Sequence, residues 1–162
     1  RSTKISVVIV NGFSHMVVFK NDHVDRLPPL IKKKVCALWK IAFNVIDDEL
    51  EINHYPIVYA LHNLKIIGFA TLESNRRYGG VLGTWMHNLC VDRLWRGQGV
   101  GGALIKQCHD LLPSDTALHV LIDTAEPKLV NYYENNMFRQ LSLRRTNYDY
   151  IIMERDVSMV LV

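Results

Sequence analysis

Four of the nine glycines in this 162-residue chain lie within six residues, at positions 97, 99, 101 and 102, and Arg96 comes directly before them. Glycine at alternate positions between a strand and a helix lets backbone amides converge on an anion at the positive end of the helix dipole, because no β-carbon stands in the way. The pattern therefore predicts a loop that binds a phosphate or pyrophosphate. The alternative is a flexible turn that binds nothing.

Two nucleotide-type motifs overlap in this loop. The run Gly97-Gln98-Gly99-Val100-Gly101-Gly102 satisfies G-x-G-x-x-G, and Asp123 lies about 20 residues further on, where dinucleotide-binding proteins place the acid that binds the ribose. Three features argue against NAD(P). Residues 92–96 separate the first glycine from the preceding strand, only 60 residues follow Gly102, and these end in an expected hairpin rather than in further βα units.

The second motif is Arg96-x-x-Gly99-x-Gly101, which follows a strand ending in Leu89-Cys90-Val91. A further block, residues 131–138, places Tyr133 on a helix five residues before Phe138, with Met137 between them. Together the two blocks resemble the GCN5-related N-acetyltransferase superfamily. Its acetyl-CoA loop reads Arg or Gln-x-x-Gly-x-Gly or Ala, and its tyrosine-containing helix typically ends Tyr-x-x-x-Gly-Phe. Met137 stands where that family usually has glycine. The resemblance runs from about Ile57 to Asp156, and the amino-terminal third matches only in the order of its elements.

The resemblance implies a mixed α/β fold, with a mostly antiparallel sheet flanked by helices, in one N-acetyltransferase domain over residues 1–162. It implies acetyl-CoA as the co-substrate. The loop amides would hold the pyrophosphate, Arg96 would add charge, and the pantetheine would lie along the end of the strand, where an amide near Val91 polarises the thioester carbonyl. The residues expected to bind acetyl-CoA are Leu89, Cys90, Val91, Arg96, Gly97, Gln98, Gly99, Val100, Gly101, Gly102 and Asn131.

Catalysis of this kind needs a base that deprotonates the amine and an acid that protonates the departing thiolate. The family match assigns the acid to Tyr133, and His87 is the expected base because regular alternation places its side chain on the same face as Leu89 and Val91. A packed strand histidine and a buried aromatic are the alternative roles of these two residues. Glu73 and the acidic run 47–51 are weaker candidates for the base, because solvated surface explains them as well.

The elements around these residues follow from apolar spacing and from turn residues. Helices are expected over residues 30–43, 99–111 and 128–136. Strands are expected over 4–10, 16–19, 57–61, 64–72, 84–91 and 117–122. His62-Asn63 would join two of these strands, Ser74 to Gly83 would form a loop, and residues 141–145 and 148–153 would close the chain as a hairpin around Thr146-Asn147.

Composition excludes several classes of protein. Apolar residues make up 49% of the chain and charged residues 22%, as in ordinary soluble globular domains. The longest apolar runs span four or five residues, whereas a membrane-spanning helix needs about 20. The net charge of +3 and the separated basic clusters at 32–34, 76–77 and 144–145 do not favour a nucleic-acid partner.

The metal-ligating residue types show no metal pattern. The three cysteines lack a C-x-x-C pair, and the seven histidines lack H-E-x-x-H spacing, so neither a disulfide framework nor a metal site is expected. Reduced thiols and the lack of a visible secretory signal favour the cytoplasm or the nucleus.

These observations predict an acetyl-CoA-dependent enzyme that acetylates a primary amine by direct attack in a ternary complex. The acceptor would be a protein N-terminus, a lysine or a small amine. The acidic run 47–51 suits a cationic acceptor, whereas Arg76-Arg77 and Arg144-Arg145 suit an acidic peptide. The alternatives are a CoA-binding module without catalysis that acts as a sensor, and an NAD(P)-binding domain. The chain is expected to be a monomer or a homodimer.

Overall fold

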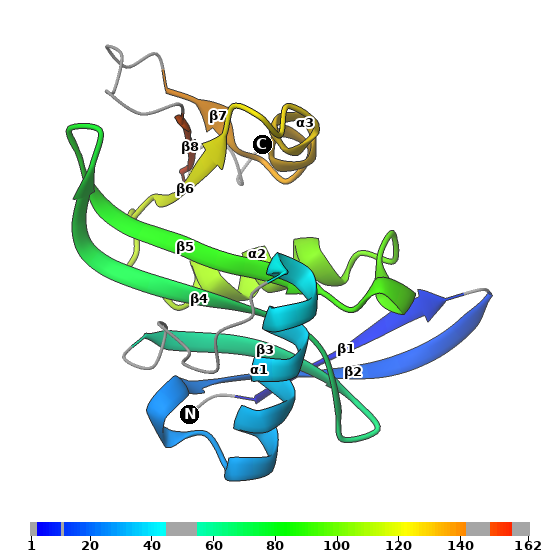
Figure 1. Ribbon diagram of the computed structural model, residues 1–162. Coiled ribbons are helices and arrows are strands. Elements are labelled where there is room, and N and C mark those ends of the chain that lie inside the picture. Colours follow the sequence, from blue (N-terminus) through cyan, green and yellow to red (C-terminus); the bar gives the residue numbers. More distant parts are fainter. Residues whose placement is uncertain (1–2, 11, 45–54, 142–149, 157–162) are drawn as a thin grey trace. The chain divides into compact units, whose positions relative to one another are not determined.

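The computed structural model describes residues 3–10, 12–44, 55–141 and 150–156 (Figure 1). Its fold is mixed α/β, with eight strands in one sheet and three α-helices. The hydrogen-bonded strand order is β1-β2-β3-β4-β5-β6-β8-β7. Of the recorded strand pairs only β5–β6 is parallel, so the expected mixed and mostly antiparallel sheet is confirmed. The elements are β1 (Thr3–Val10), β2 (Phe13–His23), η1 (Val24–Arg26), α1 (Pro29–Phe43), β3 (Pro56–His62), β4 (Lys65–Tyr78), β5 (Val81–Val91), η2 (Arg93–Trp95), α2 (Val100–Asp110), β6 (Leu118–Asp123), α3 (Lys128–Asn135), β7 (Arg139–Gln140) and β8 (Tyr150–Arg155).

The chain divides into two compact units. The first unit comprises Arg1–Leu72 and Asn88–Gln107, and the second comprises Glu73–His87 and Cys108–Val162. Strands β4 and β5 each contribute residues to both units. The expectation of one domain over residues 1–162 stays a prediction.

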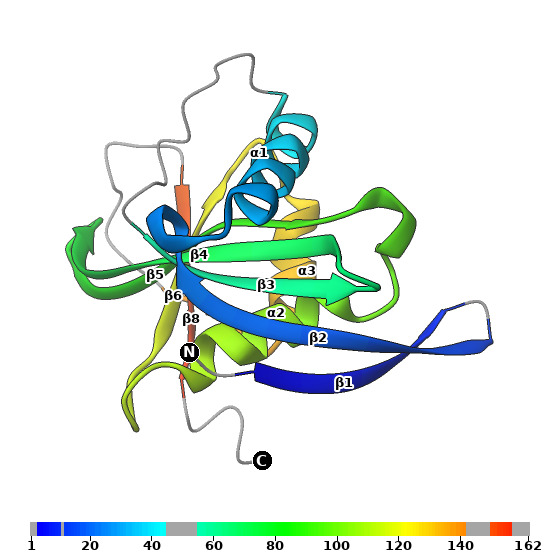
Figure 2. The same ribbon diagram turned by 90° about the horizontal axis from the view of Figure 1, so that it is seen from below.

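In the first unit, α1 and α2 lie on opposite faces of the sheet (Figures 1 and 2). Pro29 at the first helical position begins α1, and Asn44 ends it in the left-handed conformation, with φ 51°. Val35 and Trp39, one turn apart, are the buried residues of α1. They share a hydrophobic core with strand residues that include Tyr59 and Phe69.

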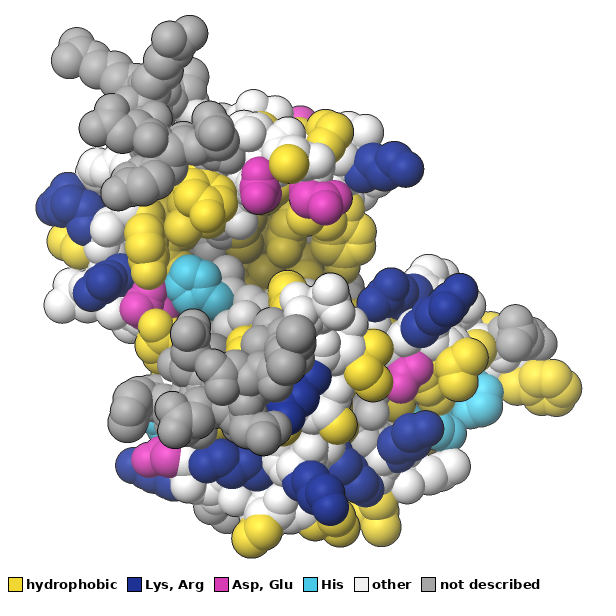
Figure 3. Space-filling model, in the orientation of Figure 1, with side chains coloured by type: hydrophobic (Ala, Val, Ile, Leu, Met, Phe, Trp, Pro, Cys, Tyr) yellow, Lys and Arg dark blue, Asp and Glu magenta, His cyan; other side chains and the backbone are white. Residues whose placement is uncertain are grey.

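The exposed residues of α1 are of mixed character and include Leu30, Lys33, Ala37 and Ile41. Its sequence carries lysines at 32, 33, 34 and 40, and dark blue side chains gather on this part of the first unit in Figure 3. Lys34 Nζ donates to the carbonyl of Leu64 at 3.1 Å, which ties the helix to the β3–β4 turn. Four of the apolar residues whose spacing predicts the buried side of α1, namely Ile31, Val35, Leu38 and Ala42, pack in or against the core, whereas Leu30 and Ile41 of the same pattern are exposed.

The β3–β4 turn differs from the expected one by one residue. Asn63 and Leu64 occupy it, both left-handed with φ of 48° and 62°. Two left-handed residues are what a tight hairpin requires, and here asparagine and leucine take that role without glycine.

In the second unit, the prediction of a loop from Ser74 to Gly83 is wrong. β4 continues to Tyr78, β5 begins at Val81, and Gly79-Gly80 alone forms the turn, with φ of 54° and 82°. The glycines act as a two-residue hairpin turn rather than as a longer break. Trp85 Nε1 donates to the Arg76 carbonyl at 2.9 Å within this hairpin.

The core of the second unit forms where β5 pairs in parallel with β6 and β6 pairs antiparallel with β8. Its fully buried side chains include Trp85, Leu118, Ile122, Phe138 and Met153. The helices and strands expected from residue 84 to residue 136 are confirmed within a few residues.

Some expectations fall outside the described residues. These are the acidic run 47–51, Arg144-Arg145 and the turn at Thr146-Asn147. The first strand of the expected hairpin, 141–145, lies outside the described residues except for Leu141, and the two-residue strand β7, which pairs with β8, comes before it. Among the described residues, no helix is both long and apolar enough to cross a bilayer.

Candidate functional site

The glycine-rich loop connects β5 to the amino terminus of α2 in the first unit. After Val91, Asp92 Oδ1 accepts from the Leu94 amide at 2.9 Å and so begins the short η2 turn. Residues 96–99 then form a turn in which Gly97 and Gly99 are left-handed, with φ of 73° and 84°. The Gly99 carbonyl accepts from the amide of Ala103 at 3.0 Å, the first hydrogen bond of α2.

The space in front of the loop is open. A β-carbon built at Gly97 or Gly99 meets no protein atom within 4 Å, so within the protein itself only the left-handed backbone conformation favours glycine at these positions. The unpaired amides of a helix amino terminus attract anions. This geometry fits a phosphate or pyrophosphate approaching the backbone closely, as the sequence pattern predicts.

The other residues of the loop differ in how they are placed. Arg96 is exposed, and its Nε donates to the carbonyl of Val91 at 3.0 Å. This hydrogen bond connects the beginning of the glycine loop to the last residue of β5. Gln98 is half-buried. Val100 is only 1% exposed, so its side chain anchors α2 in the core and only its backbone is available to a ligand.

The end of β5 supplies the strand residues expected beside the co-substrate. Leu89 and Val91 are half-buried, and Cys90 is buried in the core beneath α1. Burial raises the pKa of Cys90 to about 12, so the thiol stays protonated near neutrality. A protonated, buried thiol is a poor nucleophile, which favours the structural role expected for Cys90 over an acyl-cysteine route.

The strand is irregular immediately before these residues. Asn88 is left-handed, with φ 55°, in the interior of β5. The regular alternation expected from His87 to Val91 is therefore wrong, because a left-handed residue breaks the period of two. The alternation argument cannot group His87 with Leu89 and Val91.

In the second unit, His87 belongs to a hydrogen-bonded cluster that spans β4 and β5. His87 Nε2 and Glu73 Oε1 lie 3.1 Å apart, and the Tyr78 hydroxyl donates to the same oxygen at 2.7 Å. The Glu73 side chain is 13% exposed and that of His87 is 22% exposed. Glu73 is thus not the solvated surface residue expected from the sequence. Burial is the main cause that raises the pKa of Tyr78, and the neighbouring Glu73 adds to it.

Tyr133 lies on α3, also in the second unit, and is half-buried. Burial raises its pKa well above the usual value for tyrosine, so the phenol holds its proton at neutral pH. Its ring packs edge-on against Phe138 at 5.2 Å between centroids. Asn131, on the same helix, is exposed.

The turn after α3 keeps the backbone of the family motif without its glycine. The Phe138 amide donates to the Tyr133 carbonyl at 3.0 Å, and the Met137 amide donates to the Glu134 carbonyl at 3.1 Å. These two bonds define a Schellman motif, whose C′ residue must be left-handed. Met137 occupies that position with φ 70°, so the strain expected at this residue is present.

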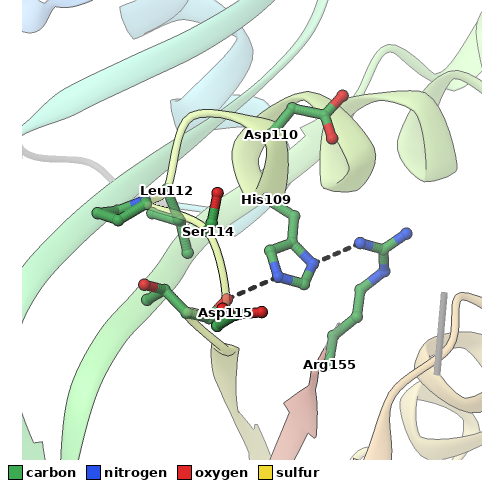
Figure 4. Close-up of a pocket in the computed structure, with 8 residues that line it drawn as sticks. His109, Asp110, Leu112, Ser114, Asp115 and Arg155 are labelled. Carbon is green, nitrogen blue, oxygen red and sulfur yellow. Dashed lines mark hydrogen bonds between the residues drawn. The ribbon is translucent and has the colours of Figure 1, made fainter. Parts of the chain in front are cut away.

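A separate hollow in the second unit contains none of the predicted site residues (Figure 4). It has a volume of about 380 Å³ and lies where α2 ends and β6 begins. His109 Nε2 donates to the Thr116 carbonyl at 2.8 Å, and Arg155 donates to His109 Nδ1. Burial and the Arg155 charge lower the pKa of His109. Within the described part of the chain, no three potential ligand side chains gather into a metal site.

A model of the "Acetyltransferase (GNAT) domain" matches residues 37–153 of the chain. The chain belongs to the GNAT family of acetyltransferases. Solved structures with the same fold include an acyl-CoA N-acyltransferase from Pseudomonas aeruginosa (16% identity, TM-score 0.65, covering 86% of this chain and 99% of that one). ElaA from Escherichia coli is also similar, with 17% sequence identity and a TM-score of 0.61. The match covers 87% of this chain and 100% of ElaA.

A third similar structure is an aminoglycoside acetyltransferase from an uncultured soil metagenomic sample, in complex with sisomicin (17% identity, TM-score 0.61, 82% of this chain and 95% of that one). Among curated proteins there is no match. Membership of the GNAT family supports acyl transfer as the activity of this chain and agrees with the mixed sheet described above.

Proposed function

We propose that this GNAT domain is an N-acetyltransferase that transfers the acetyl group of acetyl-CoA to a primary amine. The observation that carries the proposal is the pair of left-handed glycines, Gly97 and Gly99, before the amino terminus of α2, with open space in front of both. Backbone amides presented in this way suit a pyrophosphate. The family supplies the choice of CoA over a dinucleotide.

In this proposal the first unit binds the co-substrate. The amides of residues 97–102 and the charge of Arg96 hold the pyrophosphate, and the backbone of Leu89, Cys90 and Val91 holds the pantetheine as an added strand. Bound acetyl-CoA supplies an acetyl group activated as a thioester. The remaining chemistry is the movement of protons by the side chains proposed as base and acid.

His87 is the proposed general base. Because Glu73 is a carboxylate acceptor 3.1 Å from Nε2, the tautomer with the proton on Nε2 is favoured, and Nδ1 is then the basic nitrogen. His87 takes a proton from the amine, directly or through water. As the proton leaves, the amine nitrogen bonds to the acetyl carbon and the carbon–sulfur bond breaks.

Tyr133 is the proposed general acid. Its raised pKa keeps the proton on the phenol at neutral pH, so a donor is present when the sulfur departs. The thiolate receives this proton, and the phenolate regains one from the imidazolium or from solvent. The net reaction converts an amine and a thioester into an amide and a thiol.

The acceptor is proposed to be a protein N-terminus, a lysine or a small amine. One structurally similar acetyltransferase was solved with the aminoglycoside sisomicin, which supports the small-amine end of this range. The expectation of a monomer or homodimer in the cytoplasm or nucleus belongs to the proposal as well.

Substitution of Tyr133 by phenylalanine tests the mechanism. We expect Tyr133→Phe to lower kcat by about 100-fold, the smaller end of general-acid effects, and to leave acetyl-CoA affinity unchanged. Tyr132→Phe is the matched control, since Tyr132 lies on the same helix and is 37% exposed. Release of CoA thiol is measured with a panel of peptides, polyamines and aminoglycosides. An unchanged kcat in Tyr133→Phe removes this residue from the mechanism, and acetyl-CoA binding without turnover on any amine favours the sensor alternative.

A further inference from the structure

Asn88 is the left-handed residue within β5, and it lies immediately before the strand residues proposed to hold the pantetheine. A left-handed conformation is unusual inside a strand. Asparagine adopts it more readily than most residues, but a residue held there still costs stability unless its surroundings fix it. The question is therefore which contacts keep Asn88 in this conformation.

Two hydrogen bonds clamp its side chain from two other elements of the first unit. Trp39 Nε1 on α1 donates to Asn88 Oδ1 at 3.2 Å, and Asn88 Nδ2 donates to Thr71 Oγ1 on β4 at 3.1 Å. Trp39 is 7% exposed and Thr71 is fully buried. Each bond thus has one buried partner, for which the loss of the bond would leave a buried polar group unsatisfied.

The same stretch of backbone is fixed from the other face of the sheet. A β-carbon built at Gly68 would lie 3.0 Å from the Cys90 carbonyl oxygen and 3.0 Å from a methyl carbon of Leu104 on α2. The Asp92 amide donates to the Ile67 carbonyl at 2.7 Å. The backbone at Cys90 and Asp92 therefore lies close to β4, and the two side-chain bonds of Asn88 add contacts with α1 and β4 just before it.

We infer that Trp39 and Thr71 are positioning residues, which act through Asn88 to set the backbone of Leu89, Cys90 and Val91 for acetyl-CoA. This inference rests on the proposed function, because it takes that backbone as the pantetheine site. Neither side chain touches the co-substrate. Their effect is to hold one irregular residue, so that the amides after it are presented in a fixed direction.

The test removes each bond and keeps the packing. Trp39→Phe loses the indole N–H, and Thr71→Val loses the hydroxyl at nearly constant volume. We expect each variant to weaken acetyl-CoA binding by about 2- to 10-fold in calorimetric titration, the range that follows from one lost hydrogen bond. Thr71→Ser keeps the hydroxyl and restores the wild-type Kd. Backbone amide chemical shifts of residues 89–91 move in the first two variants and return in the third.

Two further comparisons separate positioning from general destabilisation. Trp85→Phe also removes a buried indole hydrogen bond, the one to the Arg76 carbonyl, but in the second unit. It is expected to lower stability and to leave the Kd for acetyl-CoA unchanged. In an Asn88→Gly background, where the left-handed conformation remains accessible and the side chain is absent, Trp39→Phe is expected to cause no additional loss of affinity.

The outcomes are distinct. If the wild-type chain binds acetyl-CoA and Trp39→Phe and Thr71→Val bind it equally well, the inference is overturned while the proposed function stands. Additive losses from Asn88→Gly and Trp39→Phe also overturn it, since the two residues would then act independently. If the wild-type chain binds no acetyl-CoA, the proposed function fails, and the amide shifts alone decide whether the clamp sets the backbone.

Discussion

Replacing Gly99 with alanine separates the cost of a strained backbone from the cost of filling the proposed phosphate site. Gly99 has φ 84°, and a β-carbon there meets no protein atom within 4 Å. Gly12, in the β1–β2 turn, has nearly the same φ of 80° and equally open space. The two positions are therefore matched in the protein alone and differ in whether a ligand is proposed to approach.

The stability effect follows from the backbone. An L-residue in the left-handed region costs roughly 1–2 kcal/mol, so both Gly99→Ala and Gly12→Ala are expected to lose about that much. For a chain of this size the melting temperature falls by about 2–8 °C. In titration calorimetry, only Gly99→Ala is expected to lose acetyl-CoA affinity, by about tenfold or more, equivalent to about 1.4 kcal/mol.

The comparison has a clear refutation. If Gly99→Ala binds acetyl-CoA as tightly as Gly12→Ala at a temperature where both are folded, no ligand approaches the backbone at Gly99. The anion-site reasoning would then be wrong, and the glycines would serve only the turn.

Three further predictions concern stability. Met137→Gly is expected to raise the free energy of unfolding by about 0.5–1 kcal/mol, because it relieves the left-handed strain at a side chain that is 50% exposed. A lower free energy of unfolding, measured by urea denaturation, would contradict this. Gly83→Ala is expected to lower the free energy of unfolding by about 1–3 kcal/mol, because the new β-carbon would lie 2.8 Å from His119 Nδ1. An unchanged melting temperature would contradict this close packing. Burial and then the charge of Arg155 lower the pKa of His109 in the folded state, so the stability that it contributes is complete above about pH 6.5 and falls as the pH drops below that value. His109→Gln should therefore lose less stability between about pH 7 and pH 5, and equal pH slopes would contradict the lowered pKa.

The parts of the fold that depend on local sequence could be predicted. The glycine loop and the beginning of α2 follow from adjacent residues, and so does the turn after α3, where Met137 takes the left-handed conformation that the motif requires. α1 could be recognised because prolines begin it and its apolar residues recur at spacings of three and four.

The features that depend on contacts between distant residues could not be predicted. Asn88 is left-handed in a stretch that reads as a regular strand, and the contact that holds it comes from Trp39, 49 residues away in the chain. Glu73 pairs with His87 across a hairpin that the sequence predicts as a loop, because Gly79-Gly80 suggests a longer break. A register that brings Tyr78 to the same carboxylate leaves no signal in the spacing of the sequence.

The central claim is that the glycine loop binds acetyl-CoA and that the domain transfers the acetyl group to an amine. The most direct measurement titrates acetyl-CoA and NADH separately into the purified chain while following its melting temperature, and then assays CoA thiol release with the amine panel. The account predicts that acetyl-CoA alone raises the melting temperature and that at least one amine causes thiol release. A rise with NADH and none with acetyl-CoA would contradict it.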